Sequence, residues 1–140
     1  MKLQVLVSTM YQENHDILHR MNINSDAIFI NQCDEDRANE VVKNQNTVTW
    51  IDSRERGLSK SRNAAVQRAT GDICLIADDD EILVDNYEDI ILEQFNENPE
   101  YDILTFQVEG IEQKFKNYYP KERPLGFLLS MKVSSVEIAF

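Results

Sequence analysis

Gly71-Asp-Ile-Cys-Leu-Ile-Ala-Asp-Asp-Asp80 is the stretch of sequence that decides the fold. Its apolar run predicts a strand over 72–77 of the kind that is covered on both faces, and such strands belong to parallel sheets. The run passes directly into carboxylates, which continue to Glu81. Ligands of parallel α/β sheets bind beyond the carboxyl ends of the strands, so this acidic run is predicted to lie at a binding site.

Strands alternate with helices on both sides of this stretch. Further strands are predicted over 3–8, 27–30, 47–51 and 102–108, with one or two more within 127–140. Helices are predicted over 13–21, 58–69 and 84–96, whereas 34–44 is polar and fits a short helix or a loop. Gly71 stands where the second helix would end with a glycine cap. The alternation predicts one α/β domain over 1–140, with a mostly parallel sheet between helices.

Composition narrows the class of protein. The 140 residues carry 14 Lys and Arg against 25 Asp and Glu, a net charge of −11, which argues against nucleic acid as a partner. No apolar run is long enough to cross a membrane, and the first ten residues lack the pattern of a signal peptide. Cys33 and Cys74 are far apart in apolar surroundings, which predicts buried free thiols and a cytoplasmic location.

The run from Asp78 to Glu81 predicts a cation site. Adjacent carboxylates repel one another unless a positive charge compensates them. Mg²⁺ is commonly held by one or two carboxylates together with substrate phosphates. The alternative is a solvated acidic turn that caps the following helix. A calcium-binding EF-hand is excluded, because Leu83 stands where that loop requires glycine.

A basic segment, Arg56-Gly-Leu-Ser-Lys-Ser-Arg-Asn63, precedes the acidic run. Gly57 permits an unusual turn, and the helix that starts there offers free backbone N–H groups to an anion. The basic side chains suit phosphates. The alternative is a basic surface helix that pairs with the acidic half of the chain.

Two histidines, His15 and His19, have the spacing of a zinc-binding pair on one helical face. No third ligand is evident, so two solvent-facing histidines are the favoured interpretation. Trp50 lies within a predicted strand and is interpreted as a core residue.

Three segments together resemble the family 2 glycosyltransferases, which have the GT-A fold: Val5-Leu-Val-Ser-Thr-Met-Tyr11, Arg56–Asn63 and Gly71–Asp80. The resemblance extends over roughly 1–108. It implies a Rossmann-like three-layer sandwich that binds a nucleoside-diphosphate sugar, such as a UDP- or GDP-sugar, with Mn²⁺ or Mg²⁺. The residues implied for the nucleotide sugar are Ser8, Thr9, Tyr11, Arg56, Ser59, Arg62, Asp78 and Asp79. Asp78 and Asp80 are implied for the metal, with Asp80 as the direct ligand.

The implied reaction is inverting transfer of the sugar to a hydroxyl of a saccharide or lipid-linked acceptor. Family members often carry an acidic pair after the second strand, where this chain has Asn31-Gln-Cys33. The chain is expected to stop before the acceptor-binding half. No general base is assigned, and Glu109 and Glu112 are the first candidates. The apolar end, with Ile138 and Phe140, predicts self-association. A nucleotidyltransferase and a non-enzymatic acidic scaffold are the alternatives.

Overall fold

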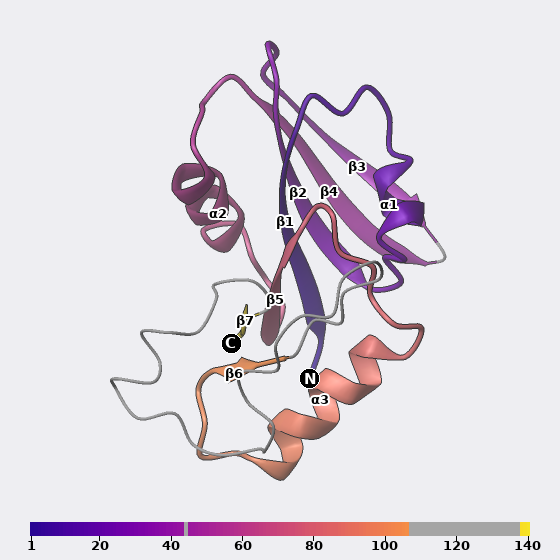
Figure 1. Ribbon diagram of the computed structural model, residues 1–140, viewed down its shortest axis with the longest axis vertical. Coiled ribbons are helices and arrows are strands. Elements are labelled where there is room, and N and C mark those ends of the chain that lie inside the picture. Colours follow the sequence, from indigo (N-terminus) through magenta and orange to yellow (C-terminus); the bar gives the residue numbers. More distant parts are fainter. Residues whose placement is uncertain (44, 107–137) are drawn as a thin grey trace, which may run out of the picture.

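Within the described residues, seven strands form one sheet at the centre of the protein, in the order β3-β4-β2-β1-β5-β7-β6. The computed structural model describes residues 1–43, 45–106 and 138–140 (Figure 1). The elements in chain order are β1 (Leu3–Met10), α1 (Ile17–Arg20), β2 (Asp26–Gln32), β3 (Arg37–Lys43), β4 (Asn46–Ser53), α2 (Leu58–Val66), β5 (Ile73–Asp78), α3 (Tyr87–Glu97), β6 (Leu104–Thr105) and β7 (Ile138–Ala139).

The central strands are parallel, as predicted. β1 pairs with β2 on one side and with β5 on the other, and β2 pairs with β4. β1 and β2 are buried almost throughout, which explains their apolar runs, since both faces are covered; Val5 and Val7 of β1 are fully buried. Burial alternates along β4. Parallel pairing brings the carboxyl ends of β1, β2, β4 and β5 to one edge of the sheet.

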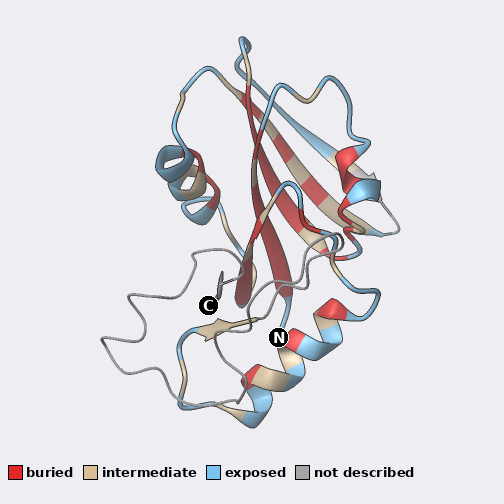
Figure 2. Cartoon of the chain, in the orientation of Figure 1, coloured by how far each residue is buried: buried red, intermediate tan, exposed pale blue. Residues whose placement is uncertain are grey.

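Helices cover both faces of this sheet and complete three layers (Figure 1). On one face, Ile17 of α1 and Phe95 of α3 pack into the larger hydrophobic cluster, which also contains Trp50. On the other face, Ala65 of α2 packs against Leu6 and other residues of the second cluster. Figure 2 shows the buried residues concentrated along the central strands and on the inner sides of the helices. Trp50 is 2% exposed, which confirms it as a core residue.

The prediction of a helix or loop over 34–44 is wrong. Residues 37–43 form the edge strand β3, which is antiparallel to β4 throughout its length. Sequence periodicity missed β3 because the side chains from Arg37 to Glu40 are exposed, so this edge strand buries no continuous apolar face.

The helices differ in length from their predicted ranges. α1 has only four residues in place of the predicted 13–21. The side chain of Asn14 accepts a hydrogen bond from the Asp16 backbone N–H at 2.9 Å, and such local bonds compete with helix formation. α2 ends three residues early, and α3 begins at Tyr87 in place of Val84.

Gly71 does not cap α2, which ends at Val66. Glycine is required here for a steric reason, because a Cβ at this position would lie 2.8 Å from the Cβ of Gln4. Gln4 also accepts hydrogen bonds from the backbone N–H groups of Thr70 and Gly71 through its Oε1. Glycine therefore lets the chain that enters β5 pass close to β1.

The end of the chain adds to the sheet. β7 lies between β5 and β6 and is antiparallel to both. Phe140 is half-buried against the second hydrophobic cluster, so its ring is not the exposed apolar end that the sequence suggested. Of the predicted strand 102–108, only Leu104–Thr105 is formed among the described residues. The remainder of the predicted C-terminal strands, and Glu109 and Glu112, lie outside the described residues.

Other predictions concern single residues. Cys74 is buried and Cys33 half-buried, and both are free thiols, so burial was predicted correctly for Cys74 alone.

His15 and His19 are both exposed. His15 precedes α1, so the two do not share one helical face, and its ring packs edge-on against Trp50 at 4.5 Å between centroids. No helix in the described part of the chain is long and apolar enough to cross a membrane.

Candidate active site

A depression of about 460 Å³ lies at the carboxyl end of the central strands. It is bounded by the ends of β1 and β2, by the turn before α2 and by the residue that follows β5. The lining residues are Ser8, Thr9, Met10, Gln32, Arg56, Gly57, Leu58 and Asp79. Four residues predicted for a nucleotide sugar thus meet here: Ser8, Thr9, Arg56 and Asp79.

Two short contacts hold the acidic end of β5. Arg62 of α2 contacts Asp78, with Nη2 and Oδ1 2.6 Å apart. The hydroxyl of Thr9, at the end of β1, donates a hydrogen bond to Oδ2 of Asp79 at 2.7 Å. Asp80 follows in a turn and is exposed. The basic and acidic segments, separated in the sequence, therefore meet at one place in the fold.

The acidic run does not cap a helix. Its last member, Glu81, folds back, and its Oε2 accepts a hydrogen bond from the backbone N–H of Asp78 at 3.1 Å. α3 begins only at Tyr87, with Asn86 at its N-cap. The alternative in which these aspartates cap the following helix is therefore wrong.

Arg56 joins several segments at this edge of the sheet. Its Nη1 donates to backbone carbonyls that include that of Cys33, at 2.8 Å. Its Nη2 donates to the Tyr11 hydroxyl at 3.2 Å and to Oδ1 of Asp34 at 2.8 Å. The guanidinium carbon lies 5.4 Å from the centre of the Tyr11 ring, within the range of a cation–π interaction. Arg56 thus places a positive charge and an aromatic ring side by side.

The turn into α2 depends on Gly57. Its φ of 120° is accessible essentially to glycine alone, and its N–H donates to Oε1 of Gln32 at 2.7 Å. Gly57 is also the N-cap residue. Ser59 is exposed in the first turn and does not line the depression, so its contact with a nucleotide stays a prediction.

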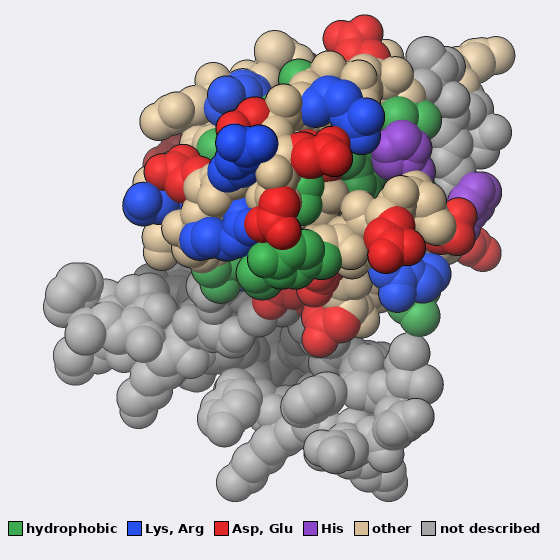
Figure 3. Space-filling model, turned by 90° about the horizontal axis from the view of Figure 1, so that it is seen from above, with side chains coloured by type: hydrophobic (Ala, Val, Ile, Leu, Met, Phe, Trp, Pro, Cys, Tyr) green, Lys and Arg blue, Asp and Glu red, His purple; other side chains and the backbone are tan. Residues whose placement is uncertain are grey.

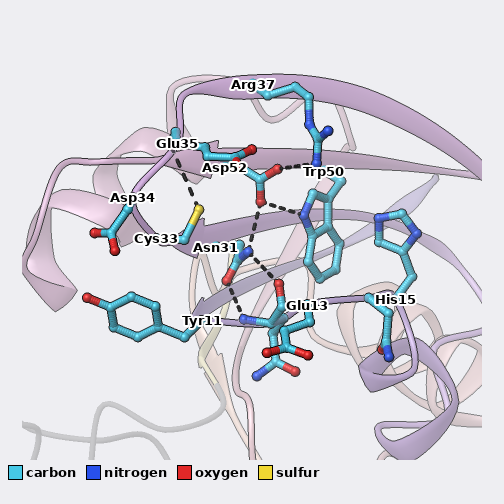
Figure 4. A pocket seen from close by; sticks show the side chains of 12 residues that line it. Tyr11, Glu13, His15, Asn31, Cys33, Asp34, Glu35, Arg37, Trp50 and Asp52 are labelled. Carbon is cyan, nitrogen blue, oxygen red and sulfur yellow. Dashed lines mark hydrogen bonds and ion pairs between the residues drawn. The ribbon is translucent and has the colours of Figure 1, made fainter.

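Sequence reasoning missed a polar network beside Tyr11. Asn31, Trp50 and Asp52 line a second depression of about 360 Å³ (Figure 4). Asn31 and Asp52 each follow a predicted strand, so both were expected near the ligand-binding end of the sheet, but the contact between them was not predicted. Alternation within β4 was the available signal, since it assigns Val48, Trp50 and Asp52 to the same face.

Charged side chains of both signs mingle at this end of the molecule, which Figure 3 views from above. Within residues 1–43, 45–106 and 138–140, no three His, Cys, Asp or Glu side chains are grouped as a complete metal site. Any cation at Asp78–Asp80 would therefore need further ligands from a bound molecule or from residues outside the described ranges.

Solved structures of other proteins share this fold. Two crystal structures of S. aureus TarS, residues 1–349, share the fold. The first has a TM-score of 0.71 at 17% identity, covering 99% of this chain and 46% of the TarS chain. The second, a complex with UDP-GlcNAc, has a TM-score of 0.61 at 17% identity, covering 83% of this chain and 37% of the other. This chain thus spans less than half of the TarS chain.

No curated protein matches the sequence. The family described as Glycosyl transferase family 2 matches residues 3–138, which is nearly the whole chain. The match includes the ends of β1 and β5 and the start of α2, the segments that meet in the structure. The chain belongs to glycosyl transferase family 2.

Proposed function

We propose that this chain is the donor-binding part of a metal-dependent, inverting glycosyltransferase. Its donor would be a UDP- or GDP-sugar, and its acceptor a hydroxyl of a saccharide or a lipid-linked molecule. Family membership supports a role in sugar transfer. The observation that carries the proposal is the contact between Arg62 and Asp78, which joins the cationic start of α2 to the acidic end of β5.

The two depressions suggest how a donor would lie. Tyr11 and Arg56 present an aromatic ring and a cation at the rim, suited to a nucleobase and its ribose. The hydroxyls of Ser8 and Thr9 line the depression that leads toward Asp79. The Ser8 Oγ is buried and lacks a hydrogen-bond partner among the described residues, so it can donate to an oxygen of the donor.

The carboxylates after β5 fit a divalent cation that shares its ligands with the donor. Oδ1 of Asp78 is engaged by Arg62, whereas Asp80 is exposed. One or two carboxylates combined with diphosphate oxygens make a suitable oxygen set for Mg²⁺ or Mn²⁺. We therefore propose Asp80 as the direct ligand and Asp78 as a second. A cation bound there would neutralise the charge that develops on the departing nucleoside diphosphate.

The chemical step requires a group on the acceptor side. The acceptor oxygen forms a bond to the anomeric carbon, the bond from that carbon to the diphosphate oxygen breaks, and a general base takes the hydroxyl proton. Arg62 and the N-terminal turn of α2 supply positive charge near the leaving group. Glu109 and Glu112 stay the first candidates for the base.

Family membership argues against the two alternatives, a nucleotidyltransferase and an acidic scaffold. The free thiols of Cys33 and Cys74 support the proposed cytoplasmic location. Assembly into a homo-oligomer stays a proposal. The ring of Phe140 gives it less support than expected, because that ring packs against the second hydrophobic cluster of its own chain.

Calorimetric titration of the chain with UDP and with GDP, each with and without Mn²⁺, tests the proposal. We expect saturable binding of one nucleotide that requires the cation. Titration with ATP is the control for general affinity toward phosphates. A chain that binds neither UDP nor GDP under any of these conditions would refute the donor site.

A further inference from the structure

The side chain of Asn31 is joined to the backbone of the loop that follows β1. Its Oδ1 accepts a hydrogen bond from the N–H of Gln12 at 3.0 Å, and its Nδ2 donates to the carbonyl of Gln12 at 3.1 Å. The second Nδ2 hydrogen is donated to Oδ1 of Asp52 at 2.8 Å. Asn31 is 1% exposed. Both amide donors are therefore committed to the protein and are not available to a ligand.

Asp52 fixes the orientation of this amide. It is 5% exposed, and its Oδ1 also accepts from Nε1 of Trp50 at 3.0 Å, while Oδ2 contacts Arg37 at 3.2 Å. Burial opposes ionisation, but the hydrogen bonds from Asn31, Trp50 and Arg37 outweigh it, so the pKa of Asp52 lies below its ordinary value. An ionised carboxylate only accepts hydrogen bonds. Asn31 must therefore turn its NH₂ group toward Asp52 and its oxygen toward the N–H of Gln12.

The residue before Gln12 depends on this anchor. Tyr11 has a φ of 49°, a left-handed conformation that is unfavourable for a residue other than glycine. Tyr11 is 58% exposed, so burial of its side chain does little to hold this conformation. The backbone holds it instead: the N–H of Tyr11 donates to the carbonyl of Gln32 at 3.1 Å, and Asn31 clamps the next residue. In Figure 4, Asn31 lies between the rings of Tyr11 and Trp50.

We propose that Asn31 and Asp52 are positioning residues of the donor site, which hold the turn at Tyr11 so that its ring stands preformed beside Arg56. The inference rests on the proposed function, because it assigns Tyr11 to the nucleoside. A loop already held in its binding conformation loses less conformational freedom when a ligand binds. The effect on affinity is therefore exerted through Tyr11, without contact between Asn31 or Asp52 and the donor.

A double-mutant cycle tests this path. The affinity for UDP with Mn²⁺ (or for GDP, if wild type prefers it) is measured for wild type, Asn31→Ala, Tyr11→Ala and the double variant. We expect each single variant to bind about five- to tenfold more weakly, the equivalent of ordering one or two side chains. The double variant should bind no more weakly than Tyr11→Ala, since Asn31 acts through that ring.

Three further variants separate positioning from loss of stability. Asp52→Asn keeps an acceptor for Asn31 and Trp50 and should retain affinity within about twofold, whereas Asp52→Ala should match Asn31→Ala. Asp26→Asn removes the ion pair with Lys2 at the opposite end of β2, and should lower stability without changing affinity. Trp50 is the only tryptophan, so its emission should shift in Asn31→Ala and Asp52→Ala but not in Asp26→Asn.

If the double variant loses affinity by the product of the two single losses, Asn31 acts independently of Tyr11. That result, or an unchanged affinity of Asn31→Ala, would overturn the positioning role while leaving the donor site in place. Equal losses in Asp52→Asn and Asp52→Ala would overturn the role of the acceptor at this position, and this comparison remains decisive if Asn31→Ala fails to fold. A wild-type chain that binds neither nucleotide would refute the proposed function and this inference together.

Discussion

Asp80 differs from the two carboxylates before it in the contacts that it makes. Asp78 contacts Arg62, and Asp79 accepts a hydrogen bond from Thr9. Asp79 and Asp80 are both exposed in the turn after β5, but within the described ranges Asp80 makes no such contact. Substitution Asp80→Asn should abolish Mn²⁺-dependent nucleotide binding, because the neutral amide lacks the negative charge with which a carboxylate holds the cation. The free energy of unfolding should stay equal or rise by up to about 0.5 kcal/mol, since one repelling charge is lost. Calorimetry and urea denaturation measure the two effects.

Asp102→Asn is the matched control for this change. Asp102 is exposed beyond the end of α3, and its replacement removes the same charge from the acidic half of the chain. It should leave nucleotide binding unchanged. Unaltered Mn²⁺-dependent affinity in Asp80→Asn itself would remove Asp80 from the site.

At the scale of elements, a buried hydroxyl joins α3 to the residues that precede β2. Tyr87 is 4% exposed; its oxygen accepts a hydrogen bond from the Asn24 backbone N–H at 2.9 Å and lies 2.8 Å from Oγ of Ser25. Tyr87→Phe would leave that N–H without its acceptor, so we expect a loss of about 1–3 kcal/mol in the free energy of unfolding. Tyr101→Phe, at a half-buried ring beyond α3, should cost less than about 0.5 kcal/mol. Equal unfolding midpoints for the two variants would contradict this role of the hydroxyl.

The amino ends of the central strands are joined by Asp26 of β2. It contacts Lys2 before β1, and it accepts a hydrogen bond from the backbone N–H of Thr47 in β4. Burial raises the pKa of Asp26, but the bonds from Lys2 and Thr47 and the charge of Lys2 outweigh it, so the pKa is lowered. Such a carboxyl stabilises the fold fully above its unfolded pKa of about 3.9, and this stabilisation is lost as the pH falls through the lower folded pKa.

Asp26→Asn should therefore cost about 1 kcal/mol at pH 7, and this difference from wild type should shrink below about pH 4. Urea unfolding of both chains at pH 7 and at pH 3 gives the comparison. A difference of the same size at both pH values would show that ionisation of Asp26 does not contribute.

The elements that could be predicted from the sequence are those whose burial produces a continuous apolar run. β1, β2, β4 and β5 were predicted within two residues at each end, because β1, β2 and β5 are mostly buried and β4 buries alternate residues. β3 was missed because its exposed residues bury no periodic face. α1 was predicted too long because local side-chain hydrogen bonds replace part of a helix.

At the site, the segments that contain Arg56 and Asp78 were predicted from their charge and from their position next to strand ends. The Asn31–Asp52 network was not, since its pairing across β2 and β4 depends on strand register.

At the scale of the whole molecule, the sheet joins segments that are far apart in the sequence. β7, near the end of the chain, lies between β5 and β6. The backbone of Phe140 exchanges two hydrogen bonds with Cys74, at 2.9 Å and 2.6 Å. This pairing covers the edge of β5, whose other end carries Asp78. An uncovered edge of a central strand is a template for pairing with another chain.

Ala139→Pro tests this closure, because Ala139 lies inside β7 between β5 and β6, and proline is poorly tolerated between two paired strands. We expect a loss of about 1–3 kcal/mol in the free energy of unfolding, since a group of the sheet is left without its partner, together with self-association through the exposed edge of β5. Ala139→Gly keeps the N–H and should cost no more than about 1 kcal/mol without changing the oligomeric state. Denaturant unfolding and light scattering, each over a range of protein concentrations, separate the two effects. If Ala139→Pro had the same free energy of unfolding and the same oligomeric state as Ala139→Gly, β7 would not be needed to close the sheet.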